Sequence, residues 1–174
     1  MKIITASEEH IPVIRQIARN TWNDAYSSIL TEEQSEYMLD WMYSNDSLKD
    51  QIKNKNHVFL LVKGSYDEYV GFASYELNYQ DKPITKIHKI YILPEYQHQG
   101  VGNALVSRIA EIAESNSNKA LQLNVNKHNK ALEFYKSLGF DVIASECIDI
   151  GKGFIMDDYI LEKKVMTRFI TINT

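Results

Sequence analysis

The stretch KIYILPEYQHQGVG, residues 89–102, joins one apolar segment to another through amide side chains and two glycines. Residues 84–93 are rich in β-branched and apolar side chains, which predicts a strand that ends before Pro94. After the loop, apolar residues recur at intervals of four, four and three, which predicts one face of a helix: Val101, Leu105, Ile109 and Ile112. Gly100 and Gly102 therefore lie where that helix begins.

This glycine loop has two interpretations. The first N–H groups of a helix lack internal partners and lie at the positive end of its dipole, so an anion such as a phosphate can bind where no side chains cover them. Gln97, His98 and Gln99 would add neutral or titratable donors. Alternatively, the glycines only allow the helix to pack closely on the sheet. A P-loop would need Gly-Lys-Ser/Thr, and a dinucleotide-binding loop would need a third glycine after Gly102, and neither is present.

The other segments give the fold class. Helices are predicted over 14–25, 31–42, 47–53 and 129–138, and strands over 1–6, 57–63, 69–79, 120–125, 140–150 and 154–165. This order predicts an α+β domain whose sheet is mostly antiparallel, with one parallel pair formed by the strand-helix-strand unit between residues 84 and 125. We expect a single domain over residues 1–174, with a core over 1–165. The tail 166–174 could extend the last strand, pair with another subunit in a homodimer, or be disordered.

Composition excludes several classes of protein. Hydrophobic residues are 44% and charged residues 24% of the chain, which is typical of a globular protein and not of a disordered one. The net charge of −4, without a dense Lys/Arg block, argues against a nucleic-acid partner. No apolar run approaches the roughly 20 residues of a membrane span, and no signal-peptide segment precedes the domain, so we expect a cytoplasmic protein without membrane contact.

Metal-binding and disulfide chemistry are not expected. The single cysteine, Cys147, excludes an internal disulfide and is expected to be a small buried side chain. His10, His57 and His128 show no metal-ligand spacing, so no metal is assigned.

Two motifs together resemble those of a known superfamily. Gln97-His-Gln-Gly-Val-Gly102 has the form QxxGxG, and it is followed downstream by the segment Asn129-Lys-Ala-Leu-Glu-Phe-Tyr-Lys-Ser-Leu-Gly-Phe140. Their order, with a strand between them, resembles the GNAT superfamily of acetyl-CoA-dependent N-acetyltransferases. Trp22-Asn-Asp-Ala-Tyr26 and Gly153-Phe-Ile-Met-Asp-Asp158 are similar to segments of small bacterial amine acetyltransferases, including spermidine/spermine N-acetyltransferases.

The resemblance implies that acetyl-CoA is the cosubstrate and assigns its contacts. The strand before the loop would splay from its neighbour and offer backbone groups to the pantetheine arm and the acetyl carbonyl, while the loop would hold the pyrophosphate. The implied contact residues are Ile90, Tyr91, Ile92, Gln97, His98, Gln99, Gly100, Val101, Gly102, Asn103, Asn129, Tyr135 and Lys136. Many relatives carry Arg or Lys in the loop, whereas this loop has no fixed charge. Without the resemblance, Ile90 and Ile92 are core residues, Asn129 is a helix N-cap and Lys136 is a solvent-facing lysine.

The same resemblance makes Tyr135 the general acid near the thioester sulfur, since a phenol of pKa about 10 can donate to a thiolate at neutral pH. The alternative is a core aromatic residue. His88 is the candidate general base, because strand alternation would place it on the same face as Ile90 and Ile92. The alternative is a structural histidine. Trp22 and Tyr26 are candidate acceptor-binding residues, although aromatic residues at helical spacing are also typical of a core.

The predicted function is therefore transfer of the acetyl group of acetyl-CoA to the primary amine of a small molecule, with polyamines as one class, by direct attack in a ternary complex. Two alternatives stay open: a catalytically silent CoA-binding module, and an acetyltransferase that acts on a protein or peptide amine. Five acidic residues could attract a cationic amine, with solvated surface charge as the alternative for each: Asp24, Glu32, Glu33, Asp157 and Asp158.

Overall fold

A seven-stranded sheet forms the centre of the protein, as described by a computed structural model for residues 1–165. The predicted tail 166–174 lies outside the described residues. The strand order is β1-β2-β3-β4-β5-β7-β6, and every neighbouring pair is antiparallel except the parallel pair β4 and β5. The strands are β1 (Lys2–Thr5), β2 (Val58–Lys63), β3 (Tyr69–Glu76), β4 (Ile84–Ile92), β5 (Ala120–Asn126), β6 (Asp141–Gly151) and β7 (Phe154–Lys164). The predicted α+β class is confirmed.

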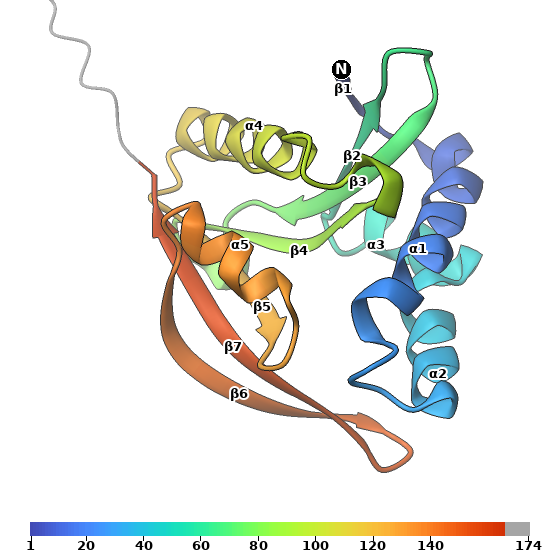
Figure 1. Ribbon diagram of the computed structural model, residues 1–174. Helices are drawn as coiled ribbons and strands as arrows, with labels where there is room; N and C mark the ends of the chain where they lie inside the picture. The colour runs from blue at the N-terminus through green and yellow to red at the C-terminus, as the bar shows by residue number, and fades with distance from the viewer. Residues whose placement is uncertain (166–174) are drawn as a thin grey trace, which may run out of the picture.

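Helices cover both faces of this sheet (Figure 1). Helices α1 (Ile11–Tyr26), α2 (Glu32–Tyr43) and α3 (Asn45–Lys53) lie on one side, and α4 (Val101–Ser115) and α5 (Ala131–Ser137) lie on the other. Short 3-10 turns span Glu8–His10, Tyr79–Asp81 and Pro94–Tyr96. Each face has its own apolar core: Trp22 and Leu48 are fully buried on the first side, and Leu105 and Ile109 on the second.

Local chemistry explains where the helices begin. The side chain of Thr31 accepts a hydrogen bond from the backbone N–H of Gln34 at 3.1 Å, which caps α2 as its capping-box sequence predicts. Ser44 caps α3 in the same way through the N–H of Ser47. Pro12 lies in the first turn of α1, where its missing N–H has no partner to lose.

Strands β4 and β5 separate partway along their length. Their parallel pairing runs from Ile84 opposite Ala120 to Ile87 opposite Leu123, although β4 continues to Ile92 and β5 to Asn126. Beyond Ile87 the edge of β4 that faces β5 is therefore unpaired, which is the splay that the resemblance implies. Peptide groups on such an edge need other partners.

The β3–β4 pairing contains a bulge at His88, because Tyr75 lies opposite Ile87 whereas Ser74 lies opposite Lys89. Ile87 shares one apolar core with Ile90 and Ile92, so the alternation of the strand is interrupted between them. The predicted direction of the His88 side chain, on the same face as Ile90 and Ile92, assumed regular alternation and is therefore wrong. The bulge, and not a regular period of two, sets where this side chain lies.

Strand β6 forms an edge of the sheet, and its residues from Asp141 to Cys147 are exposed. The expectation that Cys147 is buried is wrong, since this thiol is exposed on that edge strand. Among residues 1–165, no helix is long and apolar enough to cross a membrane.

Candidate active site

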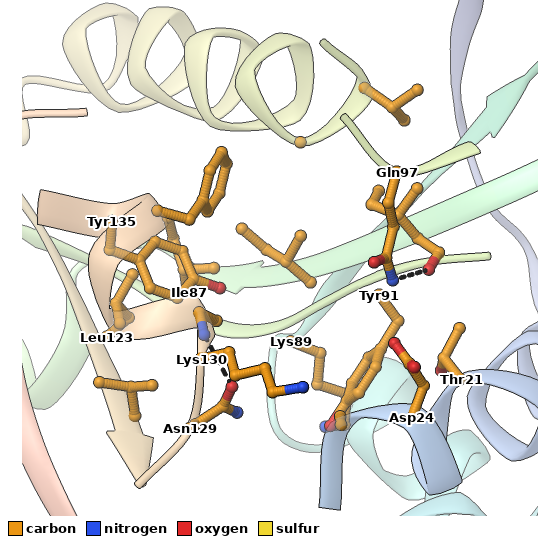
Figure 2. A pocket seen from close by; sticks show the side chains of 18 of the residues that line it. Thr21, Asp24, Ile87, Lys89, Tyr91, Gln97, Leu123, Asn129, Lys130 and Tyr135 are labelled. Atoms are coloured by element: carbon orange, nitrogen blue, oxygen red, sulfur yellow. Dashed lines mark hydrogen bonds between the residues drawn. The ribbon is translucent and has the colours of Figure 1, made fainter. Parts of the chain in front are cut away.

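A cavity of about 410 Å³ opens where β4 and β5 separate (Figure 2). Its wall is formed by the last residues of both strands, the loop before α4, the beginnings of α4 and α5, and the end of α1. The wall contains these residues that the sequence predicted: Asp24, Tyr26, His88, Ile90, Tyr91, Ile92, Gln97, His98, Gly100, Val101, Gly102, Asn103, Asn129 and Tyr135. The structure thus brings two distant segments, 87–103 and 123–135, to one cavity.

The two glycines of the loop have different roles. Gly100 has a φ of 82°, in the left-handed region that favours glycine, and a Cβ added there would meet nothing within 4 Å. A Cβ on Gly102 would instead lie 2.9 Å from Cζ of Phe134. Gly100 therefore sets the backbone conformation at the start of α4, and Gly102 allows close packing of α4 against α5.

The N-terminus of α4 points its free donors at the cavity. The first helical hydrogen bond of α4 is donated by Ala104 N–H to the carbonyl of Gly100 at 3.0 Å, so the preceding N–H groups lie before the helical ladder begins. No acidic side chain lies in this first turn. These backbone N–H groups thus lie at the positive end of a 15-residue helix, an arrangement that can attract an anion.

Two predicted donor contacts, Gln99 and Lys136, are not in the cavity wall, whereas Lys130, which the sequence did not indicate, is. Gln99 turns back to donate to the carbonyl of Glu95 at 3.0 Å, and Nζ of Lys136 lies 3.7 Å from Glu133 on the outer surface of α5. Lys130, directly before α5, lines the cavity instead (Figure 2). The structure makes Lys130 the N-cap residue of α5, whereas Oδ1 of the predicted N-cap, Asn129, accepts from the N–H of Ala131 at 2.9 Å; the position of Lys130 next to Asn129 is the signal that could have found it.

The unpaired edge of β4 presents backbone groups to the cavity. Leu93 N–H donates to the carbonyl of Val70 at 2.9 Å, on the β3 side. Because successive peptide groups of a strand alternate in direction, those of Ile92 and Ile90 point to the opposite side, toward β5. Gln97 contacts the Ile92 carbonyl on this edge, donating from its Nε2 at 3.1 Å, and so fixes the loop to the strand.

Tyr135 lies at the junction of cavity and core. Its side chain is 9% exposed and packs against Phe134 and Phe140, with ring centroids 5.3 and 5.8 Å away. Burial, with a smaller contribution from Tyr26, raises the pKa of Tyr135 above its ordinary value of 10.0. The phenol therefore keeps its proton at neutral pH and can donate a hydrogen bond into the cavity. Tyr135 is thus both a residue of the apolar core and a residue of the cavity wall.

A second, smaller cavity of about 100 Å³ adjoins the first and shares Tyr26, His88, Lys89, Tyr91 and Asn124 with it. The rest of its wall is mostly apolar, with one amide and one carboxylate: Leu30, Met38, Met42, Tyr43, Ile155, Met156, Asn126 and Asp158.

Asp158 is 2% exposed, so the alternative of a solvated surface charge does not apply to it. Burial raises the pKa of its carboxyl, and the side chain of Asn124 lies 3.5 Å away. Trp22 is fully buried in the core of α1 and lies in neither cavity wall, whereas Tyr26 lines both.

The sequence profile of the family described as "Acetyltransferase (GNAT) domain" matches residues 26–156. The chain therefore belongs to the GNAT acetyltransferases, and the predicted family is confirmed.

The chain is similar to several known proteins. It is 24% identical over 161 residues to a spermidine N(1)-acetyltransferase of Thermoplasma acidophilum, a match that covers 90% of this chain and 96% of that protein. It also resembles the crystal structure of the PaiA N-acetyltransferase of Thermoplasma acidophilum in complex with coenzyme A, with a TM-score of 0.76, 25% identity, and coverage of 94% of this chain and 99% of that one. A third match, to an uncharacterized N-acetyltransferase of Methanocaldococcus jannaschii, is 34% identical over 77 residues and covers 41% of this chain but only 34% of that protein.

Proposed function

We propose that this enzyme transfers the acetyl group of acetyl-CoA to the primary amine of a small molecule, with an alkyl chain and a second cationic group, by direct attack in a ternary complex. The observation that carries the proposal is the convergence of the free β4 edge, the N-terminus of α4 and the Tyr135 side chain on one cavity.

In this proposal the pyrophosphate of the donor binds at the backbone N–H groups between Gly100 and Asn103. The loop itself carries no Lys or Arg, so Lys130 supplies the fixed positive charge from the opposite wall. The pantetheine arm then follows the unpaired edge of β4, where the peptide groups of Ile90 and Ile92 are the available partners.

The thioester lies near Tyr135 in this arrangement. A backbone N–H on the β4 edge, that of Ile92 or Ile90, stabilises the oxyanion of the tetrahedral intermediate, a contact that contributes roughly 3–4 kcal/mol in enzymes where it has been removed. The amine nitrogen forms the new bond to the carbonyl carbon, and the carbon–sulfur bond breaks. The thiolate of CoA then takes a proton from the Tyr135 phenol, and the phenolate recovers the proton that the nitrogen loses as the amide forms.

The smaller cavity is the proposed acceptor pocket. Its methionine and tyrosine side chains suit an alkyl chain, and the buried carboxyl of Asp158 suits an ammonium group. The similarity to a spermidine acetyltransferase supports the same class of acceptor. A polyamine meets both requirements, since it carries a reacting amine and further cationic nitrogens on an alkyl chain.

Thiol release from acetyl-CoA, measured with a panel of polyamines, monoamines of matched chain length, arylalkylamines, aminoglycosides and peptide N-termini, tests the proposal. We expect turnover with diamines or polyamines and a higher KM for the matched monoamines. Acetyl-CoA binding without release of thiol by any amine would instead identify a silent CoA-binding protein. Turnover with peptide N-termini alone would identify an enzyme that modifies proteins.

A further inference from the structure

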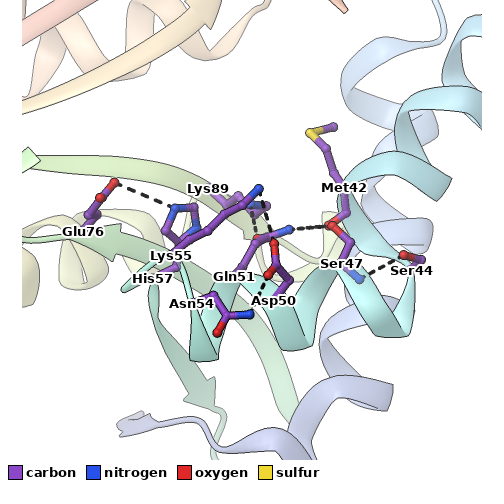
Figure 3. Close-up of polar contacts among 10 residues, drawn as sticks. All are labelled: Met42, Ser44, Ser47, Asp50, Gln51, Asn54, Lys55, His57, Glu76 and Lys89. Carbon is purple, nitrogen blue, oxygen red and sulfur yellow. Dashed lines mark hydrogen bonds and ion pairs between the residues drawn. The ribbon is translucent and has the colours of Figure 1, made fainter. Parts of the chain in front are cut away.

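His88 and Glu76 form a hydrogen-bonded pair of side chains beside the proposed acceptor pocket, outside the glycine loop and the apolar core. His88 lines both cavities, and its Nε2 lies 2.9 Å from Oε2 of Glu76, the last residue of β3. Nε2 of His57 lies 3.8 Å from the same oxygen (Figure 3), and the two imidazole rings are stacked with centroids 3.9 Å apart and an interplanar angle of 15°. The bulge at His88 is what turns this side chain toward β3 and Glu76.

The surroundings of the pair keep the imidazole of His88 neutral. Burial, with further contributions from nearby positive charges, lowers the pKa of His88 below 6.5, and burial raises the pKa of Glu76 above 4.5. The groups that face the pair come from several elements: His57 before β2, Lys55 after α3, Lys86 and Lys89 on β4, and the ring of Tyr79. A neutral imidazole beside a carboxylate donates its Nε2–H to that carboxylate, which leaves the lone pair on Nδ1.

We infer that Glu76 receives the proton of the acceptor amine through His88, so that the imidazole conducts the proton and the carboxylate holds it. The inference rests on the proposed function. One proton of the bound ammonium group moves to Nδ1 of His88 while the Nε2 proton moves to Oε2 of Glu76. The nitrogen lone pair that this frees attacks the thioester carbon, and the nitrogen loses its second proton as the tetrahedral intermediate collapses. His88 is neutral before and after the step, and Glu76 becomes a neutral carboxylic acid.

These separate roles of His88 and Glu76 explain the low basicity of the imidazole and the partial exposure of the carboxylate. An imidazole that resists protonation cannot keep the proton of the amine. It can still pass a proton on, because it accepts one at Nδ1 while it donates another from Nε2. The side chain of Glu76 is 23% exposed, so it can lose its proton to water after each turnover, while His88 loses its Nδ1 proton and regains its Nε2 proton by exchange with water. Glu76 lies in neither cavity wall, so it acts through His88 as a positioning and proton-accepting residue.

A divalent cation is the other chemistry that these donors could serve. His57, Glu76 and His88 offer ligand atoms within 4.8 Å of one another. However, the ammonium groups of Lys55, Lys86 and Lys89 lie near enough to lower the pKa of His88, and they oppose a bound cation for the same electrostatic reason. We therefore favour the proton relay.

The test is Glu76→Gln, which keeps an oxygen that can accept from His88 but cannot take a proton. We expect kcat to fall roughly 100-fold, the scale of general-base catalysis, with the KM for acetyl-CoA unchanged. In the wild type, kcat/KM for the amine rises with pH as Glu76 loses its proton and then levels. In E76Q it should keep rising toward the pKa of the free amine, about 10.4, because the amine must arrive already deprotonated. E76D should recover part of kcat and the levelling.

Glu162→Gln is the matched control, since Glu162 also accepts a side-chain hydrogen bond, from Gln122 at 2.7 Å, but on β7 and outside both cavities. It should behave as the wild type. If E76Q does not fold, a carbon-13 NMR titration of the wild-type Glu76 carboxyl decides, because its pKa must match the acid limb of kcat/KM.

Three results would overturn the relay: an E76Q profile that superimposes on that of the wild type, a mismatch in the NMR titration, or loss of wild-type activity on chelation with recovery by Zn²⁺. A wild type that releases no thiol with any amine would overturn the proposed function, and the relay with it.

Discussion

Substitution of Gly102 by alanine tests how α4 and α5 are held together around the donor cavity. The added Cβ would lie 2.9 Å from Cζ of Phe134, whereas carbon atoms in contact prefer about 3.5–4.0 Å, so the ring or the helix must move by roughly 0.5–1 Å. Overpacking of this kind costs about 1–3 kcal/mol. Phe134 immediately precedes Tyr135, so the displacement should also disturb the proposed acid.

The double variant G102A/F134L isolates this contact. Leucine has no atom at the Cζ position, so the clash should vanish. The double variant should therefore lose less free energy of unfolding than the sum of the two single losses, by at least about 0.5 kcal/mol. Gly100→Ala is the matched control. It should lose about 1–2 kcal/mol from its left-handed backbone, but a Cβ there meets nothing within 4 Å, so its combination with F134L should be additive.

Urea unfolding followed by circular dichroism gives the free energies of unfolding of the wild type, G102A, F134L and G102A/F134L. Calorimetric titration with acetyl-CoA reports the effect on the cavity. Additive effects of G102A and F134L would refute the steric role of Gly102. The glycine would then serve only the backbone of the loop, as Gly100 does.

Three further predictions concern single side chains. Lys130→Met should weaken acetyl-CoA binding by roughly tenfold and reduce its dependence on salt, while Lys136→Met on the outer surface should leave both unchanged; equal effects in calorimetry would contradict the assignment of Lys130. Tyr135→Phe should lower the rate of thiol release by roughly 100-fold with little change in acetyl-CoA affinity, and a normal rate would remove Tyr135 as the acid. Asp158→Asn should raise the KM for cationic acceptors and also raise the melting temperature at pH 7. Burial raises the folded-state pKa of Asp158 above 3.8, so its ionisation opposes folding once the pH exceeds that value; the gain in stability should therefore shrink toward pH 4, and a gain independent of pH would contradict this reasoning.

The positions of the helices and strands could be predicted from the sequence because their signals are local. The spacing of apolar residues along α4, the cap at Thr31 and the glycine at the start of α4 each depend on residues a few positions apart. The order of these segments, with the motifs at 97–102 and 129–140, was also sufficient to indicate the family.

The sequence by itself therefore determined the fold class, the family and the segment that lies at the donor cavity. Only the tertiary structure decided which side chains act there, because that depends on contacts between residues far apart in the chain. The bulge that directs His88 toward Glu76 arises from the register of β4 against β3. Asp158 is buried because β7 packs beside α2. Lys130, directly before α5, lies in the cavity wall, whereas Lys136 lies on the outer surface of that helix. Periodicity cannot reveal such differences, since one extra residue in a strand, or a shift of about two residues along a helix, reverses the direction of a side chain without changing the local pattern.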